Sequence, residues 1–104
     1  MNEPEVLWLD EQRVVSLTEL VEVSGLTREE LLELVQGGAI PVRESSGTNY
    51  TFSAQVISVA RTASRLRDEL ELDMAGLGVA LRLLDRVHVL EAEIVRLRAL
   101  LPRS

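Results

Sequence analysis

Apolar residues recur at helical spacing in two short stretches, each introduced by a residue that can cap a helix. Ser16 stands three residues before Glu19, and Thr27 stands three residues before Glu30, the spacing of a capping box. The apolar residues after each cap share one helix face: Leu17, Leu20 and Val21, then Leu31, Leu34 and Val35. Gly25 separates the two stretches. The pattern predicts a helix-turn-helix.

A pair of strands is predicted after the second helix. Gly37 and Gly38 end that helix, and the apolar-rich runs 39–43 and 50–52 then flank a polar turn at 44–49. Two strands around a loop, directly after a helix-turn-helix, are typical of the wing of a winged helix.

A second, smaller hairpin is predicted ahead of the first helix. The runs 6–9 and 13–16 contain apolar residues and flank the polar residues 10–12. Trp8 lies in the first run, and we interpret it as a cover for the small core rather than as a ligand-stacking residue.

A long helix is predicted after the wing, with Ser53 as its cap. Its apolar residues recur at helical spacing over about five turns: Val56, Val59, Ala60, Ala63, Leu66 and Leu70. Asp73 can then cap a further helix that begins at about Met74. Gly76 and Gly78 fall in its first turns, where each glycine costs roughly 0.5–1 kcal/mol relative to alanine. Two such costs predict close packing at this corner.

The last helix carries an apolar seam with a heptad period. Its residues are spaced 4-3-4-3-4 along the sequence: Leu83, Val87, Leu90, Ile94, Leu97 and Leu101. Such a seam requires a partner helix, most simply that of a second copy in a homodimer. The alternative is that the seam folds back onto the protein's own helix at 54–70.

The composition fits one compact, mainly α-helical unit. Hydrophobic residues make up 46% of the 104 residues, with only three aromatics. We divide the unit into a winged helix-turn-helix with its long helix at 1–71 and a helical dimerisation segment at 72–104. The chain has no cysteine, which excludes disulfides. The first twelve residues lack the basic end of a signal peptide, and no stretch is apolar enough to span a membrane, so we expect cytoplasmic residence.

Acidic residues are concentrated in the first half of the chain. Residues 1–52 carry ten carboxylates and three arginines, a net charge of −7, whereas residues 53–104 carry seven carboxylates and eight arginines, a net charge of +1. The second helix of the helix-turn-helix has Arg28 against Glu29, Glu30 and Glu33. Because affinity for DNA comes largely from basic side chains, this charge makes a DNA-binding regulator the weaker alternative.

The sequence gives little support for an enzyme. His88 is the only histidine, and the heptad register places it beside Val87 at a solvent-facing position. Asp73 and Asp85 are more simply explained as a helix cap and an exposed helix residue than as a catalytic pair. No phosphate-binding loop or His-Glu metal motif occurs, so we expect no catalysis, cofactor or metal.

Three motifs resemble those of a known family. Residues 65–70 read RLRDEL, residues 72–76 read LDMAG, and residues 79–85 read VALRLLD. Together with GLTREEL at 25–31, this series resembles the CbpM family of chaperone modulators, whose layout is that of MerR-type regulators. One difference is that Met74 and Ala75 stand where family members carry Trp-Pro, which leaves open any contact made by that indole.

The resemblance implies a fold and a partner. The fold is a MerR-like helix-turn-helix with a small β wing, a long helix and a coiled-coil-like C-terminal helix. The partner is the J-domain of a DnaJ-like co-chaperone of the CbpA type, which the modulator keeps from the Hsp70 protein DnaK. The basic second helix of that J-domain is the natural target for an acidic protein. The residues expected to contact it are Glu29, Glu30, Glu33, Asp73, Gly76 and Asp85.

Overall fold

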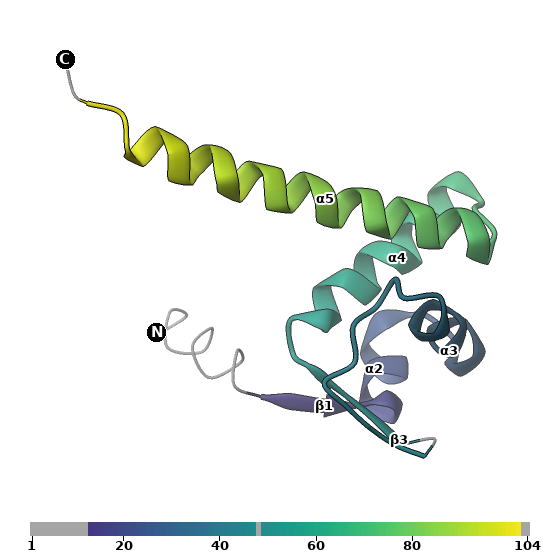
Figure 1. The fold of residues 1–104 in the computed structure, drawn as a ribbon. Helices are drawn as coiled ribbons and strands as arrows, with labels where there is room; N and C mark the ends of the chain where they lie inside the picture. The colour runs from purple at the N-terminus through teal and green to yellow at the C-terminus, as the bar shows by residue number, and fades with distance from the viewer. Residues whose placement is uncertain (1–12, 48, 103–104) are drawn as a thin grey trace, which may run out of the picture.

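The computed structural model describes residues 13–47 and 49–102, and these form a small helical body from which one long helix projects (Figure 1). The helices are α2 (Leu17–Ser24), α3 (Arg28–Gln36), α4 (Val56–Leu70) and α5 (Met74–Ala99). The strands are β1 (Val14–Ser16), β2 (Glu44–Ser46) and β3 (Asn49–Ser53). The predicted order of a helix-turn-helix, a wing, a long helix and a C-terminal helix is confirmed.

Both predicted capping boxes are present at the helix-turn-helix. The Ser16 Oγ accepts a hydrogen bond from the Glu19 backbone N at 3.1 Å, and the Glu19 carboxylate accepts one from the Ser16 N at 2.9 Å. Thr27 and Glu30 make the same pair of bonds. These reciprocal bonds satisfy backbone donors that the first turn of each helix leaves free.

Gly25 allows the turn between α2 and α3 to lie against α4. Its φ of 89° is in the left-handed region, and a Cβ at this position would lie 2.7 Å from the Ser64 Oγ of α4. A side chain here would therefore meet both a strained backbone and a steric contact.

The three strands form one antiparallel sheet in the order β1-β3-β2. In it Val15 pairs with Phe52 and Ser45 pairs with Tyr50. The predicted position of the first wing strand at 39–43 is wrong, since β2 lies within the stretch 44–49, for which the sequence predicts a polar turn. The backbone N–H groups of Ala39 and Ile40 instead bond to the Leu34 carbonyl, so this stretch completes the end of α3.

The prediction of an N-terminal hairpin is tested only in its second half. The run 13–16 does contain a strand, β1, but it pairs with β3 of the wing. The run 6–9 lies outside the described residues, as does Trp8.

The predicted cap of α4 is also wrong. The N-cap is Gln55, and its side chain makes no capping bond. The Ser53 Oγ accepts a hydrogen bond from the Gln55 backbone N at 3.3 Å, so Ser53 stabilises a local turn between β3 and the helix. Leu70, which the helical spacing placed on the apolar face, is 61% exposed.

One core unites the helices and the sheet. It lies between the helices, with α2 packed against the sheet and the first turns of α5 packed against α3 and α4 (Figure 1). Its buried members are Val15, Leu17, Leu20, Leu26, Leu31, Leu34, Ile40, Phe52, Val56, Ala60, Ala63, Leu77 and Leu81. Leu77 and Leu81 are the contribution of α5.

The corner before α5 is held by the predicted cap. The Asp73 Oδ1 accepts a hydrogen bond from the Gly76 backbone N at 2.8 Å. A Cβ at Gly76 would lie 3.1 Å from that same oxygen and 3.5 Å from Leu72 Cδ2. The tight packing at Gly76 therefore comes from the residues of the corner itself.

Beyond its first turns, α5 leaves the body of the molecule. The helix has 26 residues, about 39 Å in length, and every residue from 85 to 102 is exposed. The alternative in which the seam folds back onto α4 is therefore wrong. Among the described residues, no helix is long and apolar enough to cross a membrane.

Candidate partner-binding surfaces

The three glutamates of α3 have different environments. Glu29 and Glu33 are exposed and lie one turn apart, so they share a side of the helix. Glu30 is only 22% exposed and its carboxylate forms an ion pair with Arg67 of α4, in addition to its capping bond with Thr27. Of these three candidates, Glu29 and Glu33 are available to a partner, whereas Glu30 stabilises the fold.

Arg67 connects α4 to the turn of the helix-turn-helix. Besides its ion pair with Glu30, its Nη2 donates to the Gly25 carbonyl at 3.3 Å and its Nε donates to the Asp68 carboxylate at 3.0 Å. The hydrogen bond with Asp68, together with the charge of Glu30, raises the pKa of Arg67 above its ordinary value against an opposing effect of desolvation. The Arg67 guanidinium is thus a permanent cation that is bonded both to the helix-turn-helix and to its own helix, α4.

A second arginine of α4 makes a similar connection. The Arg61 Nε donates to the Val23 carbonyl near the end of α2 at 3.0 Å. Sequence patterns could not identify either connection, because the bonded residues are separated by 37 residues or more and share no local motif. Both arginines hold the helix-turn-helix against α4.

A notch of about 280 Å³ lies between α3 and the start of α5. Glu33 and Gly37 line it from one side, and Met74, Ala75 and Gly78 line it from the other. The structure thus places Glu33 beside the helix that Asp73 caps. Because Gly37 and Gly78 have no side chains, the notch has room beside Glu33 for a side chain from a partner.

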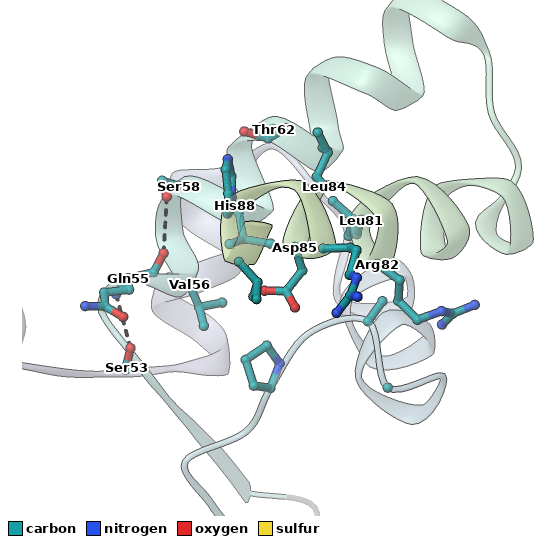
Figure 2. A pocket seen from close by; sticks show the side chains of 16 residues that line it. Ser53, Gln55, Val56, Ser58, Thr62, Leu81, Arg82, Leu84, Asp85 and His88 are labelled. Atoms are coloured by element: carbon teal, nitrogen blue, oxygen red, sulfur yellow. Dashed lines mark hydrogen bonds between the residues drawn. The ribbon is translucent and has the colours of Figure 1, made fainter. Parts of the chain in front are cut away.

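A larger groove of about 720 Å³ runs between α4 and α5 (Figure 2). Asp85 lies on this groove, as does His88, which is exposed as predicted but also forms part of the wall. The groove and the notch share Ala39 and Arg82. The candidate partner-binding residues are therefore divided, since Glu33 faces the notch and Asp85 faces the groove.

Arg82 reinforces the wall that separates these two surfaces. Its Nη1 donates to the Gly37 carbonyl at the end of α3, at 3.0 Å. A cation at the C-terminal end of a helix also interacts favourably with the helix dipole. This bond links α3 to α5 across the corner.

The predicted seam of α5 is an exposed apolar stripe. Four consecutive members are between 45% and 49% exposed: Val87, Leu90, Ile94 and Leu97. Leu83, at its start, is 61% exposed, whereas Leu101 lies beyond the end of α5 at Ala99, so its predicted place on the helical seam is wrong; it is 67% exposed. A contiguous apolar stripe of this length is typical of a protein–protein interface.

Comparison with known proteins identifies the relatives of this fold. A model of the MerR HTH family of regulatory proteins matches residues 15–99. A chaperone modulatory protein CbpM of Salmonella arizonae is 41% identical over 78 residues, which cover 75% of this chain and 77% of the relative. CbpM of Escherichia coli is 39% identical over 88 residues, covering 85% and 87%. The chain belongs to the CbpM family.

Membership of the CbpM family confirms the resemblance drawn from the three sequence motifs. The relatives' names support a chaperone-modulating role, and with the regulatory type of the MerR model they favour a protein without enzymatic activity. Across residues 13–47 and 49–102, no group of three or more acidic or histidine side chains has an arrangement that could hold a metal ion.

Proposed function

We propose that the protein binds the J-domain of a DnaJ-like co-chaperone of the CbpA type and blocks its cooperation with the Hsp70 protein DnaK. The observation that carries this proposal is the relationship to CbpM, at 39–41% identity over most of both chains. Such an inhibitor needs no catalytic group, because occupying the surface that a J-domain offers to Hsp70 is sufficient.

The contact surface that we propose is formed by α3 and the corner before α5. Glu29, Glu33 and Asp73 are exposed there, and the notch beside Glu33 can receive a side chain from the partner. Opposite charges on two partners accelerate encounter and set specificity. An acidic surface of this kind suits the basic second helix expected of a J-domain. Gly76 supports the surface indirectly, because its lack of a side chain leaves room for the Asp73 cap. Asp85 lies apart from this surface.

The alternative of a DNA-binding regulator is not favoured by the charges of α3. In a winged helix-turn-helix this helix would enter the major groove, yet Glu29 and Glu33 are exposed on it and Arg28 is its only basic residue. Arg61 of α4 is bonded to the end of α2, and Arg67 is bonded to the turn of the helix-turn-helix. These two arginines are therefore engaged within the fold rather than left for phosphate contacts.

We also propose that the protein is a homodimer through residues 72–104. In a single chain the seam leaves Val87, Leu90, Ile94 and Leu97 about half exposed. Burying such side chains stabilises an interface by roughly 25 cal/mol per Å² of apolar surface. A second copy supplies an identical stripe, and the pairing would present two α3 surfaces to partners.

The experiment that tests the function is a titration with the CbpA-type J-domain of the same organism. We expect binding that weakens as the salt concentration rises, and inhibition of J-domain-stimulated DnaK ATPase activity. The variant Glu29→Lys/Glu33→Lys should slow association severalfold. Glu30 should be left unchanged, because its substitution would break the ion pair with Arg67 and confuse folding with binding.

A matched control is the variant Glu22→Lys/Glu69→Lys, which makes the same change in charge at exposed positions of α2 and α4. This control should change the association rate less than Glu29→Lys/Glu33→Lys does. Equal losses in the two variants would contradict the proposed contact surface. An absence of J-domain binding, together with specific binding of duplex DNA at physiological salt, would replace the whole proposal with a transcription regulator.

A further inference from the structure

Gly78 in α5 is not required by the packing of the described chain. The sequence predicts close packing at both Gly76 and Gly78, and at Gly76 the corner itself supplies it. A Cβ at Gly78 would lie 3.8 Å from the Arg82 Nη1 and 4.0 Å from the Ala39 Cβ, which are ordinary van der Waals contacts. Among the residues that the structure describes, the predicted close packing is therefore absent at Gly78. The helix bears the cost of a glycine that an alanine could replace.

Gly78 forms part of the floor of the notch between α3 and α5. The notch has a volume of about 280 Å³, which is below the range of about 300–1,000 Å³ that small-molecule sites occupy. Its size suits a single side chain. A Cβ at Gly78 would lie against Arg82 and Ala39, which also line the notch, so a larger residue would take up part of this space.

The walls of the notch combine apolar atoms with one carboxylate. Leu34, Met74 and Ala75 supply the apolar surface, and the flexible thioether of Met74 can adapt to an occupant. Glu33 is exposed at the rim, and within the described chain its carboxylate has no bonding partner. Arg82, the other charged residue of the wall, already donates to a backbone carbonyl of α3. The matching occupant is a side chain with a long aliphatic stem and a cationic end.

The position of the notch at the C-terminal end of α3 also favours a cation. The carbonyl groups of the last helical turn carry partial negative charge. Arg82 demonstrates this preference within the chain, because its guanidinium is bonded to the Gly37 carbonyl. Exposed carboxylates extend the acidic surface on both sides: Glu29 lies one turn before Glu33 on α3, and Asp73 lies at the start of α5.

We propose that the notch holds one lysine or arginine side chain of the partner, with its stem across Gly78 and its cation at the Glu33 carboxylate. This assignment rests on the proposed function, because the basic side chain comes from the second helix of the J-domain. An acidic surface alone attracts any basic protein, whereas a notch of fixed depth selects partners by the position and length of one side chain. Gly78 is thereby a residue that sets specificity.

Filling the notch should weaken binding without loss of stability. Gly78→Ala should raise the midpoint of thermal unfolding, because alanine is the better helix former, and should raise the Kd for the J-domain severalfold. Gly78→Leu should raise that Kd about tenfold or more. Ala92→Leu is the control, since it adds an apolar side chain at an exposed position of α5 outside both the notch and the seam. Isothermal titration calorimetry should give the control an unchanged Kd.

A double-mutant cycle identifies the occupant. Each lysine and arginine of the J-domain's second helix is replaced in turn by methionine, which keeps an apolar stem and removes the charge. At one position the loss of affinity should be coupled to Glu33→Gln by about fivefold or more, and it should largely vanish in the Gly78→Leu background. Glu29→Gln, the same change one turn away, should show weaker coupling to that position.

Four results would contradict the assignment. Wild-type affinity in Gly78→Leu would overturn it and leave J-domain binding in place. A lower midpoint of thermal unfolding in Gly78→Ala would show that the protein's own packing needs the glycine. If Gly78→Leu weakens self-association in sedimentation equilibrium but not J-domain binding, the occupant is a second copy. If the wild-type chain does not bind the J-domain, the proposed function and this assignment are both wrong.

Discussion

The two halves of α5 belong to one continuous helix but have opposite surroundings. In residues 74–84, Leu77 and Leu81 are buried in the core and Leu84 packs against it. In residues 85–99, eight of the fifteen residues are apolar, yet all of them are exposed. The first half is stabilised by contacts within the chain, whereas the second half keeps an apolar stripe that no other described part of the chain covers. Hydrophobicity alone does not distinguish a core helix from an interface helix.

The largest expected effect comes from a matched pair of leucine truncations. Leu77 is fully buried, so Leu77→Ala should reduce the free energy of unfolding by about 2–5 kcal/mol at any protein concentration. Leu90 is 46% exposed, so the same change there should cost less than about 0.5 kcal/mol in dilute protein. Urea denaturation at several protein concentrations measures both. A large loss for Leu90→Ala in dilute monomer would break the distinction between the halves.

A smaller effect is expected on assembly. Ile94→Lys should weaken the proposed dimer by about tenfold or more, since burial of such a side chain contributes about 1.5–3 kcal/mol. Val95→Lys is the control, because Val95 is 68% exposed and lies beside the seam rather than on it. Sedimentation equilibrium gives the dissociation constants. A strict monomer at tens of micromolar, unchanged by either substitution, would remove the dimer.

The smallest effect concerns the start of the first half. Asp73→Ala removes the acceptor for the Gly76 N–H and should cost about 1 kcal/mol. Asp85→Ala makes the same change at an exposed position inside the helix, where a surface substitution is worth about 0.5 kcal/mol or less. Thermal unfolding of the two variants gives the comparison. Equal stabilities would show that the corner does not depend on its cap.

The features that sequence predicted correctly are those encoded within a few residues. The caps at Ser16, Thr27 and Asp73 each need only an acceptor side chain and a backbone N–H three residues later, so the local sequence determines them. The heptad spacing likewise identifies the apolar stripe on α5, because it depends only on residues three or four positions apart.

The errors arise where distant residues decide the local structure. The wing strand lies at 44–46 rather than 39–43 because Ala39 and Ile40 are bonded to the end of α3 and because β3 selects which residues pair with it. The role of Glu30 was hidden for the same reason. Its partner Arg67 is 37 residues away, so the local sequence predicts a glutamate available to a partner, whereas its carboxylate is used inside the fold.

Ser16 has a consequence for how the molecule unfolds. It is both the last residue of β1, opposite Thr51, and the N-cap of α2. The extended conformation that an N-cap requires is thus fixed by strand pairing across a separation of 35 residues. Separation of β1 from β3 would release the first turn of α2 at the same moment. Amide hydrogens of the sheet and of the start of α2 should therefore exchange with solvent as one cooperative unit.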